Sequence, residues 1–336
     1  MNTAPPLSRA RIYDLIYALA ARDGRHKTLF GNTAPLARAA FENGLCGTAF
    51  PELWFELPLA GEPWFDLHML VAHDDRYELA SFAGLGGVYA HALDWFATSE
   101  DTRQLALSFD TGRGSVDKPA IQLLLERRSV DAARGFLTAA GRANLTDAYR
   151  SFIRAMPSAW YACYLGVFPA RTSKDCEVRA NWVRVECIVG HELPHAYAPD
   201  AELLRAHLEQ VGLLELGDTL IPRVQELARS SFPLEFQFDV DADGGAMPTF
   251  SASLRFSVKD WLSASQRAAI DQQWQRAQDW GLADDRWHQL AGTVYANRVA
   301  FAGKSARLYC YPAFIKLRWR DGEPLDAKAY LIAGTT

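Results

Sequence analysis

The sequence predicts a mixed α/β protein whose repeated helix–helix–strand–strand units form a closed ten-stranded antiparallel barrel ringed by helices. Pairs of strands with alternating apolar and polar residues recur about five times, helix-period patterns separate them, and no linker or low-complexity tract interrupts the order. About ten antiparallel strands twist enough that the sheet must close, split or flatten. Helices between the hairpins would cover one face of the sheet, so a closed barrel is the simplest packing. We expect it to form a single domain over residues 1–336.

The first hairpin, in residues 51–72, shows the strand pattern most clearly. One face of this stretch carries only apolar side chains, and the other carries Trp54, Glu56, Asp66 and His68. The apolar face requires a packing partner, which the helices would supply. The other face would line the lumen of a barrel, whereas in the rival fold of two open sheets it would meet solvent.

In chain order, the helical and strand patterns follow each other with short connections. Ser8 and Ser263 are expected to cap the first and last helices. Helices are predicted at 8–19, 34–43, 82–97, 131–156 (in two pieces), 200–211, 220–230 and 263–281. Hairpins are predicted to join 53–57 with 65–71, 104–110 with 118–126, 160–167 with 178–189, 234–240 with 249–258, and 307–319 with 325–332. The run 294–319 is long enough for an extra strand, and Pro312 should bulge or break it.

The composition argues against several classes of protein. The chain has 336 residues, of which 49% are apolar and 22% charged, and its net charge is −5. These values are typical of a globular protein, and the lack of a Lys or Arg run disfavours nucleic acid or a membrane as a partner. No apolar run reaches the roughly 20 residues of a spanning helix. The N-terminal residues lack the apolar core of a signal peptide, so we expect a cytoplasmic protein with reduced cysteines.

This order of elements resembles the ABBA or PT-barrel family of soluble aromatic prenyltransferases, whose ten-stranded barrel holds the active site in its lumen. FELPL is similar to the family strand whose Glu hydrogen-bonds the acceptor N–H, which implies that role for Glu56. FDLHM resembles the strand whose Asp holds Mg²⁺ in the metal-dependent branch, which implies Asp66 as a metal ligand. FDTGRGSVDKPA and AKAYL resemble diphosphate-binding stretches, which implies phosphate contacts for Lys118, Lys328 and Tyr330. From this resemblance we expect Mg²⁺ to stimulate activity without being essential, and we expect no other cofactor.

The chain departs from the family pattern in two places. Ala120 stands where the family often has Tyr, two residues after the diphosphate-binding Lys. The stretch 249–253 lacks the Arg expected in the middle of that strand, and Arg255 on the same face is the candidate substitute.

Without the family, the polar faces of the strands still predict a ligand site. A buried, uncompensated mixture of charges is costly, so such a lumen must be wet or hold a polar ligand. Lys and Arg suit a diphosphate, aromatic rings can shield an allylic cation, and a carboxylate can remove a ring proton. Taken together with the resemblance, these considerations make Glu56 and Asp66 the predicted catalytic residues. The predicted substrate-binding residues are Trp54, His68, Lys118, Gln122, Trp182, Arg184, Ser251, Arg255, Lys328 and Tyr330.

Structural roles are the simpler explanation for each of these residues taken singly. A charged residue on a strand more often lies at a solvated strand end, as we expect for Lys316 and Arg318 at the barrel mouth. A salt bridge from Glu56 to Arg184 or Lys118 would hold the lumen together without touching a substrate.

The stretch 191–195, HELPH, matches the H-E-x-x-H pattern of zinc hydrolases. That chemistry needs both histidines one helical turn apart on a helix. Pro194 removes a backbone donor and disfavours helical geometry in the residue before it, so we expect a loop here. A zinc hydrolase that uses His191 and His195 is therefore a minor alternative.

Together these observations predict a transferase, a prenyltransferase that acts on an aromatic acceptor. The prenyl donor would be an allylic diphosphate, dimethylallyl or geranyl, and the acceptor an indole or phenol, either free or within a peptide. A barrel that binds a hydrophobic small molecule without catalysis is the alternative. Neither nucleic acid nor a membrane is an expected partner.

Overall fold

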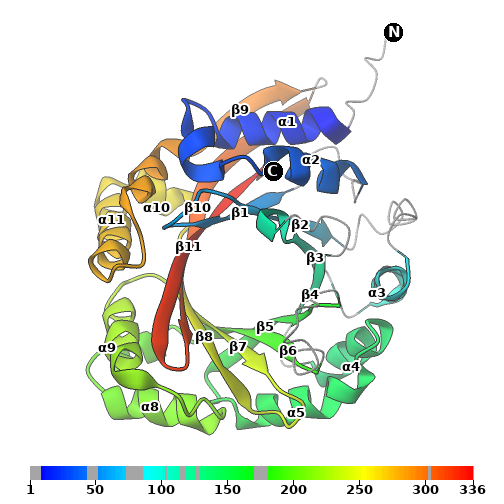
Figure 1. Ribbon diagram of the computed structural model, residues 1–336, viewed down its shortest axis with the longest axis vertical. Coiled ribbons are helices and arrows are strands. Elements are labelled where there is room, and N and C mark those ends of the chain that lie inside the picture. Colours follow the sequence, from blue (N-terminus) through cyan, green and yellow to red (C-terminus); the bar gives the residue numbers. More distant parts are fainter. Residues whose placement is uncertain are drawn as a thin grey trace.

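Ten antiparallel strands close into a barrel, because the last strand, β11 (Glu323–Thr335), pairs with the first, β1 (Leu53–Pro58). Figure 1 looks into this barrel and shows the helices arranged around its outer side. The computed structural model describes residues 9–43, 52–72, 86–100, 102, 104–113, 119–125, 129–169, 181–301 and 304–335. The closed ring confirms the predicted fold and excludes the rival of two open sheets.

The strands follow one another around the ring in chain order, with one strand outside it. Between β1 and β11 lie β2 (Asp66–Ala72), β3 (Gln104–Phe109), β4 (Ala120–Leu124), β5 (Trp160–Val167), β6 (Val183–Val189), β7 (Leu234–Val240), β8 (Ala246–Arg255) and β10 (Lys304–Arg320). The additional strand, β9 (Tyr295–Phe301), extends the sheet beside the first part of β10. This strand confirms the extra strand predicted in 294–319, and the register shift in β10 after Pro312 confirms the expected bulge.

The helices lie between the hairpins, as the repeat predicts. They are α1 (Arg9–Ala20), α2 (Ala34–Asn43), α3 (Val88–Thr98), α4 (Val130–Ala139), α5 (Thr146–Ala155), α7 (Leu193–Tyr197), α8 (Ala201–Gln210), α9 (Gly217–Ala228), α10 (Val258–Leu262) and α11 (Ala264–Asp279). No helix in the described part of the chain is long and apolar enough to cross a membrane.

The hydrophobic core fills the space between the helices and the outer face of the barrel. Phe55 on β1 is fully buried there, with its ring centroid 5.5 Å from Phe30 and 5.4 Å from Phe65. Trp160 on β5 packs in the same way, 5.2 Å from the ring of Phe236. Burying each such side chain contributes about 1.5–3 kcal/mol. If the register of a strand shifted by one residue, its apolar side chains would point into the lumen. Packing of this core therefore fixes which side chains face inward.

Two helix boundaries differ from the prediction. The predicted helix at 82–97 begins, in the described residues, at Val88, because Gly87 has a φ of 64° that an α-helix does not allow. The stretch 191–195, predicted to be a loop, enters the short helix α7. Pro194 lies in the first turn of that helix, where a missing backbone N–H costs no intrahelical hydrogen bond.

Helix capping also differs in one detail. Ser263 stands at the N-cap of α11 but makes no capping hydrogen bond with its side chain. Ser257 and Asp260 instead form a capping box that begins the additional helix α10. Ser8, the predicted cap of the first helix, lies outside the described residues.

Candidate active site

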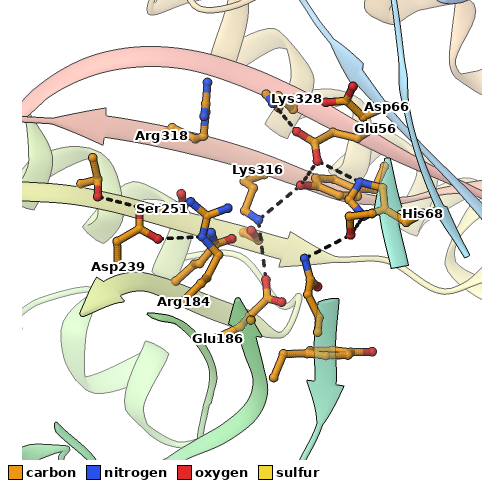
Figure 2. A pocket seen from close by; sticks show the side chains of 18 of the residues that line it. Glu56, Asp66, His68, Arg184, Glu186, Asp239, Ser251, Lys316, Arg318 and Lys328 are labelled. Atoms are coloured by element: carbon orange, nitrogen blue, oxygen red, sulfur yellow. Dashed lines mark hydrogen bonds and ion pairs between the residues drawn. The ribbon is translucent and has the colours of Figure 1, made fainter. Parts of the chain in front are cut away.

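The barrel encloses a cavity of about 260 Å³, lined by the inward faces of its strands (Figure 2). Ten strands leave room for such a cavity, whereas side chains alone nearly fill an eight-stranded barrel. The predicted site residues that line it are Trp54, Glu56, Asp66, His68, Gln122, Trp182, Arg184, Ser251, Lys328 and Tyr330. Lys118 lies outside the described residues.

Glu56, in the middle of β1, contacts three different polar side chains in the part of the cavity shown in Figure 2. Its Oε1 accepts a hydrogen bond from Lys328, and its Oε2 accepts one from the Tyr330 hydroxyl at 2.7 Å. His68 Nε2 lies 3.0 Å from the same Oε2. Burial disfavours the charged form, but Lys328 and the His68 hydrogen bond outweigh it and hold the pKa of Glu56 well below its usual range. Glu56 is therefore an ionised carboxylate held by three donors.

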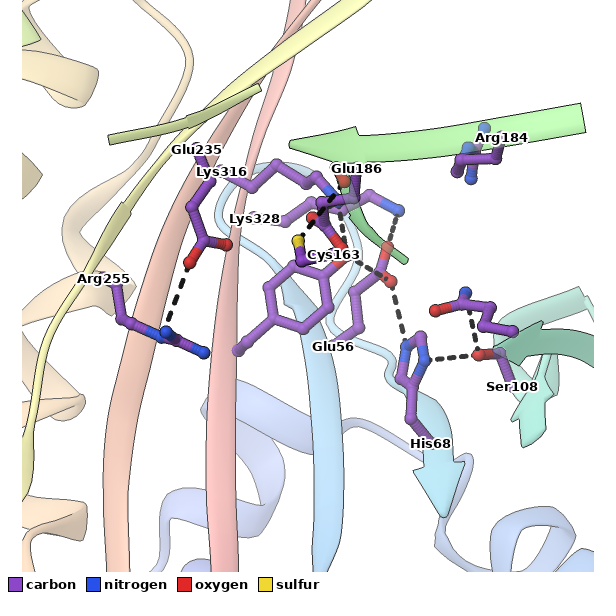
Figure 3. Close-up of polar contacts among 12 residues, drawn as sticks. Glu56, His68, Ser108, Cys163, Arg184, Glu186, Glu235, Arg255, Lys316 and Lys328 are labelled. Carbon is purple, nitrogen blue, oxygen red and sulfur yellow. Dashed lines mark hydrogen bonds and ion pairs between the residues drawn. The ribbon is translucent and has the colours of Figure 1, made fainter. Parts of the chain in front are cut away.

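A hydrogen-bonded chain continues from Glu56 across the next strands (Figure 3). His68 on β2 contacts Glu56 through Nε2 and places Nδ1 2.6 Å from the Ser108 hydroxyl on β3. The Gln122 amide on β4 donates to the same hydroxyl at 3.2 Å. His68 and Ser108 are direct cross-strand partners, so the register of the ladder itself brings them together.

Lys316 is buried and lines the cavity, which corrects its predicted place at the barrel mouth. Its Nζ is 3.3 Å from the Tyr330 hydroxyl and 3.7 Å from Glu186 Oε1. Burial lowers the pKa of Lys316, while the charges of Glu186 and Glu56 oppose this effect. Tyr330 therefore connects the Lys316–Glu186 pair to the Lys328–Glu56 pair.

Two arginines of the cavity also have carboxylate partners. Arg184 binds Asp239 through two hydrogen bonds, of 2.7 and 3.1 Å, and Arg318 binds Asp326 through two more. The salt bridge that the sequence suggested between Glu56 and Arg184 does not form, since each has another partner. These bidentate pairs hold the guanidinium groups in fixed orientations.

The charges that line the cavity nearly balance. Five are Lys or Arg, namely Arg184, Lys316, Arg318, Arg320 and Lys328. Six are Asp or Glu, namely Glu56, Asp66, Asp110, Glu186, Glu235 and Asp239. A lining with eleven charged side chains is poorly suited to a purely hydrophobic ligand, so it disfavours the apolar-binding alternative.

Two of these carboxyl groups bind protons unusually tightly. Burial and then the charge of Glu56 raise the pKa of Asp66 to about 6, although the backbone N–H of Gly112 donates to it at 3.0 Å. Burial raises the pKa of Glu235 to about 7, against the opposing charge of Arg255 at 3.5 Å. Near neutral pH the lumen therefore holds carboxyl groups that can take up or release a proton.

Aromatic rings fill the spaces between the charged groups. The ring centroids of Trp54 and Phe314 are 5.5 Å apart, and those of Phe314 and Tyr330 are 6.1 Å apart. Lys328 Nζ lies 5.3 Å from the Trp64 ring, and Lys316 Nζ lies 5.1 Å from the Tyr330 ring. The faces of these rings can stabilise positive charge in the cavity.

Arg255, the candidate substitute for a missing phosphate-binding Arg, lies at the end of β8 and is not among the residues that line the cavity. Its side chain is 45% exposed, pairs with Glu235 and lies over the Phe314 ring at 5.3 Å. It therefore holds a carboxyl group at the edge of the lumen.

Sequence reasoning missed several residues of the cavity. Ser108, Glu186 and Asp239 stand at inward positions of strands whose alternation was already visible, so the period-two pattern could have identified them. Lys316 was harder to place, because the register shift after Pro312 changes which residues of β10 face inward.

The zinc alternative finds no support in the described residues. His191 and Glu192 are exposed and pair with each other at 2.8 Å, and His195 in α7 is exposed as well. No group of three His, Cys, Asp or Glu in the described part of the chain could hold a metal ion.

Comparisons with known proteins give structural likeness only. Neither a family model nor a curated protein matches the chain. A 6-dimethylallyl tryptophan synthase is 14% identical, with a TM-score of 0.48 over 97% of this chain and 96% of that one. A 6-dimethylallyltryptophan synthase from Micromonospora olivasterospora, in complex with DMASPP and Trp, is also 14% identical, with a TM-score of 0.48 over 98% and 97%. AnaPT from Neosartorya fischeri is 10% identical, with a TM-score of 0.44 over 98% and 92%.

Proposed function

We propose that this barrel is a prenyltransferase that moves a prenyl group from an allylic diphosphate to an aromatic acceptor, an indole or a phenol, free or in a peptide. The observation that carries the proposal is the convergence of Arg184, Lys316, Arg318 and Lys328 on one enclosed cavity that aromatic rings also line. Positive groups suit the diphosphate, and the rings suit both the acceptor and the allylic cation.

The existing ion pairs leave these cations free to bind phosphate oxygens as well. A lysine ammonium has three N–H donors and a guanidinium has five. Lys328 uses one hydrogen bond on Glu56, and Arg184 uses two on Asp239. The carboxylates thus orient the cationic groups, and the remaining donors can contact the diphosphate.

Protonation of Glu235 would favour binding of the anionic donor. When Glu235 holds a proton, the charges that line the cavity change from five positive and six negative to five of each sign. An anionic donor is attracted to that state, and its own charge favours the neutral form of this carboxyl group. Binding of the diphosphate is therefore expected to take up protons near neutral pH.

Glu56 is suited to orient the acceptor rather than to take its proton. A carboxylate has about four lone-pair sites, and three donors occupy Glu56, so one site remains for an acceptor N–H or O–H. Its depressed pKa makes it a weak base. Asp66, the direct cross-strand partner of Glu56, has the higher pKa, so we assign to Asp66 the removal of the ring proton.

The enclosed cavity would protect the allylic cation from water. Trp54, Phe314 and Tyr330 form a ring-lined wall beside Glu56, where an allylic cation would meet aromatic faces instead of bulk water. The acceptor would then capture the cation before water does.

Asp66 and Asp110 are the residues that would hold Mg²⁺. Both line the cavity. Burial and then the charges of Glu56 and Asp110 raise the pKa of Asp66, and a cation bound beside these carboxyl groups would reduce their repulsion. When bound, Mg²⁺ would neutralise charge on the diphosphate. Because the described residues offer no group of three ligands, phosphate oxygens and water would have to complete its coordination, and stimulation rather than an absolute requirement is expected.

The test measures donor binding and product formation separately. The full chain is incubated with dimethylallyl or geranyl diphosphate and a panel of indoles, phenols and Trp- or Tyr-containing peptides, and mass spectrometry detects the prenylated acceptor. Lys328→Met and Lys316→Met should each weaken diphosphate binding by about 2–3 kcal/mol, or roughly 30–150-fold. Lys259→Met, on the outer helix α10, is the matched control and should bind normally. Equal diphosphate affinity in all four proteins, or no product with any acceptor, would refute the proposal.

A further inference from the structure

We propose that Ser108 is an activated nucleophile in the lumen, and that the barrel can take an acyl group from a small aromatic carboxylic ester through a serine–histidine–glutamate arrangement. The chain Ser108–His68–Glu56 carries the proposal, with distances of 2.6 Å from the serine Oγ to His68 Nδ1 and 3.0 Å from His68 Nε2 to Glu56 Oε2. These are the two hydrogen bonds that a nucleophile, a base and an orienting carboxylate require. This activity is independent of prenyl transfer.

The hydrogen bond between His68 and Glu56 sets the tautomer that the proposed reaction uses. An anionic carboxylate accepts hydrogen bonds, so the Nε2 nitrogen must carry the proton that lies between His68 and Glu56. The lone pair of Nδ1 is then directed at Ser108 and can accept its hydroxyl proton. Lys328 and Tyr330 also donate hydrogen bonds to Glu56, so the orienting carboxylate is itself fixed.

Gln122 supplies a donor beside the reacting oxygen. Its amide Nε2 lies 3.2 Å from Ser108 Oγ, close enough to stabilise an oxyanion that develops on an adjacent carbonyl. Figure 3 shows His68 between Glu56 and Ser108, with a dashed contact to each of them. Because all four residues line the same cavity, a bound ester can reach them.

The proposed reaction is balanced with water as the second substrate. Ser108 Oγ bonds to the ester carbonyl carbon as its proton moves to His68 Nδ1, and the carbon–oxygen bond to the alcohol breaks. The leaving alcohol takes that proton from His68. A water molecule, deprotonated by His68, then hydrolyses the acyl-serine, which releases the acid and restores Ser108.

The chain offers a matched control for the nucleophile. Ser253 also lines the cavity and is buried like Ser108, at 3% and 4% exposure. In the described residues Ser253 has no hydrogen bond to a histidine, whereas Ser108 has one. If lumen serines react merely because they are enclosed, the two should behave alike.

The test treats the full chain with a small alkyl fluorophosphonate and maps the adduct by peptide mass spectrometry. We expect the adduct on Ser108 in the wild type and in Ser253→Ala, and no adduct at that position in Ser108→Ala. In His68→Gln, labelling of Ser108 should slow by about 10²–10⁴-fold, the usual contribution of a general base. The rate of 4-nitrophenyl acetate hydrolysis should likewise be normal in Ser253→Ala and strongly reduced in His68→Gln and Ser108→Ala.

Thermal unfolding of each variant shows whether it is folded. Mapping of the adduct in the wild type needs no substitution, so that result does not depend on the folding of a variant. A folded wild type with no adduct on Ser108 would overturn the proposal. Equal labelling of Ser108 in a folded His68→Gln variant would also overturn the proposal, because the hydrogen bonds among Ser108, His68 and Glu56 would then be only structural. The assay contains no prenyl donor, so its failure and the failure of prenyl transfer are distinguishable.

Discussion

Replacing Glu56 by Gln tests how strongly its ion pair with Lys328 holds the barrel together. The pair joins β1 to β11, the two strands that close the ring, and the two side chains are only 11% and 9% exposed. Removing one partner of a buried ion pair leaves an uncompensated charge, which typically costs about 3–5 kcal/mol. At about 2.1 cal/mol/K per residue, a chain of 336 residues has an unfolding entropy of about 0.7 kcal/mol/K. A loss of about 3 kcal/mol therefore lowers the melting temperature by about 4 °C.

A double-mutant cycle separates the ion pair from the other contacts of Glu56. Glu56→Gln and Lys328→Met should each be destabilising, but the double variant carries neither charge and should lose less than their sum. The coupling between the two sites should be about 2–3 kcal/mol, measured from denaturant unfolding.

The Arg318–Asp326 pair is a matched comparison, because its side chains are 32% and 33% exposed. Arg318→Met and Asp326→Asn should be coupled by no more than about 1 kcal/mol, since solvent screens the pair. If the effects of Glu56→Gln and Lys328→Met add within about 0.5 kcal/mol, the buried pair does not stabilise the closed ring and the reasoning fails.

Three further predictions concern protons, metal and thiols. Because the pKa of Glu235 is raised from 4.5 to about 7, its stabilising contribution is full below pH 4.5 and is lost as the pH rises through 7. Glu235→Gln should remove about 3 kcal/mol of that pH dependence, and an unchanged profile from denaturant unfolding at pH 4 to 8 would contradict the assignment. Asp66→Asn should slow prenyl transfer by about 10²–10⁴-fold, as loss of a general base does, and should abolish the stimulation of the remaining rate by Mg²⁺. Equal rates in EDTA and Mg²⁺ for the wild type would show that no metal acts there. Burial raises the pKa of the Cys163 thiol well above its usual range and that of Cys310 to about 12. Both should resist iodoacetamide at pH 8 until the chain unfolds, as peptide mass spectrometry can show.

The sequence by itself determined the strands of the barrel and the face on which their side chains lie. Alternation in 53–57 and 65–71 predicted a hairpin with one apolar face, and the structure has β1 and β2 there, with Phe55 buried outside and Glu56 inside. The extra strand before Pro312 and the bulge beside it also followed from the local pattern. Such features are predictable because side-chain direction in a strand repeats every two residues.

Only the tertiary structure decided which charges meet across the lumen. Glu56 pairs with Lys328, 272 residues away, because the closing register sets Glu56 opposite Tyr330 and Pro58 opposite Lys328. Lys316 is buried in the lumen and not at the expected mouth, and it faces inward because the shift after Pro312 changes which residues of β10 point into the barrel. Periodicity fixes the face on which a residue lies, but its partner depends on closure and register, which are set by the packing of the whole ring.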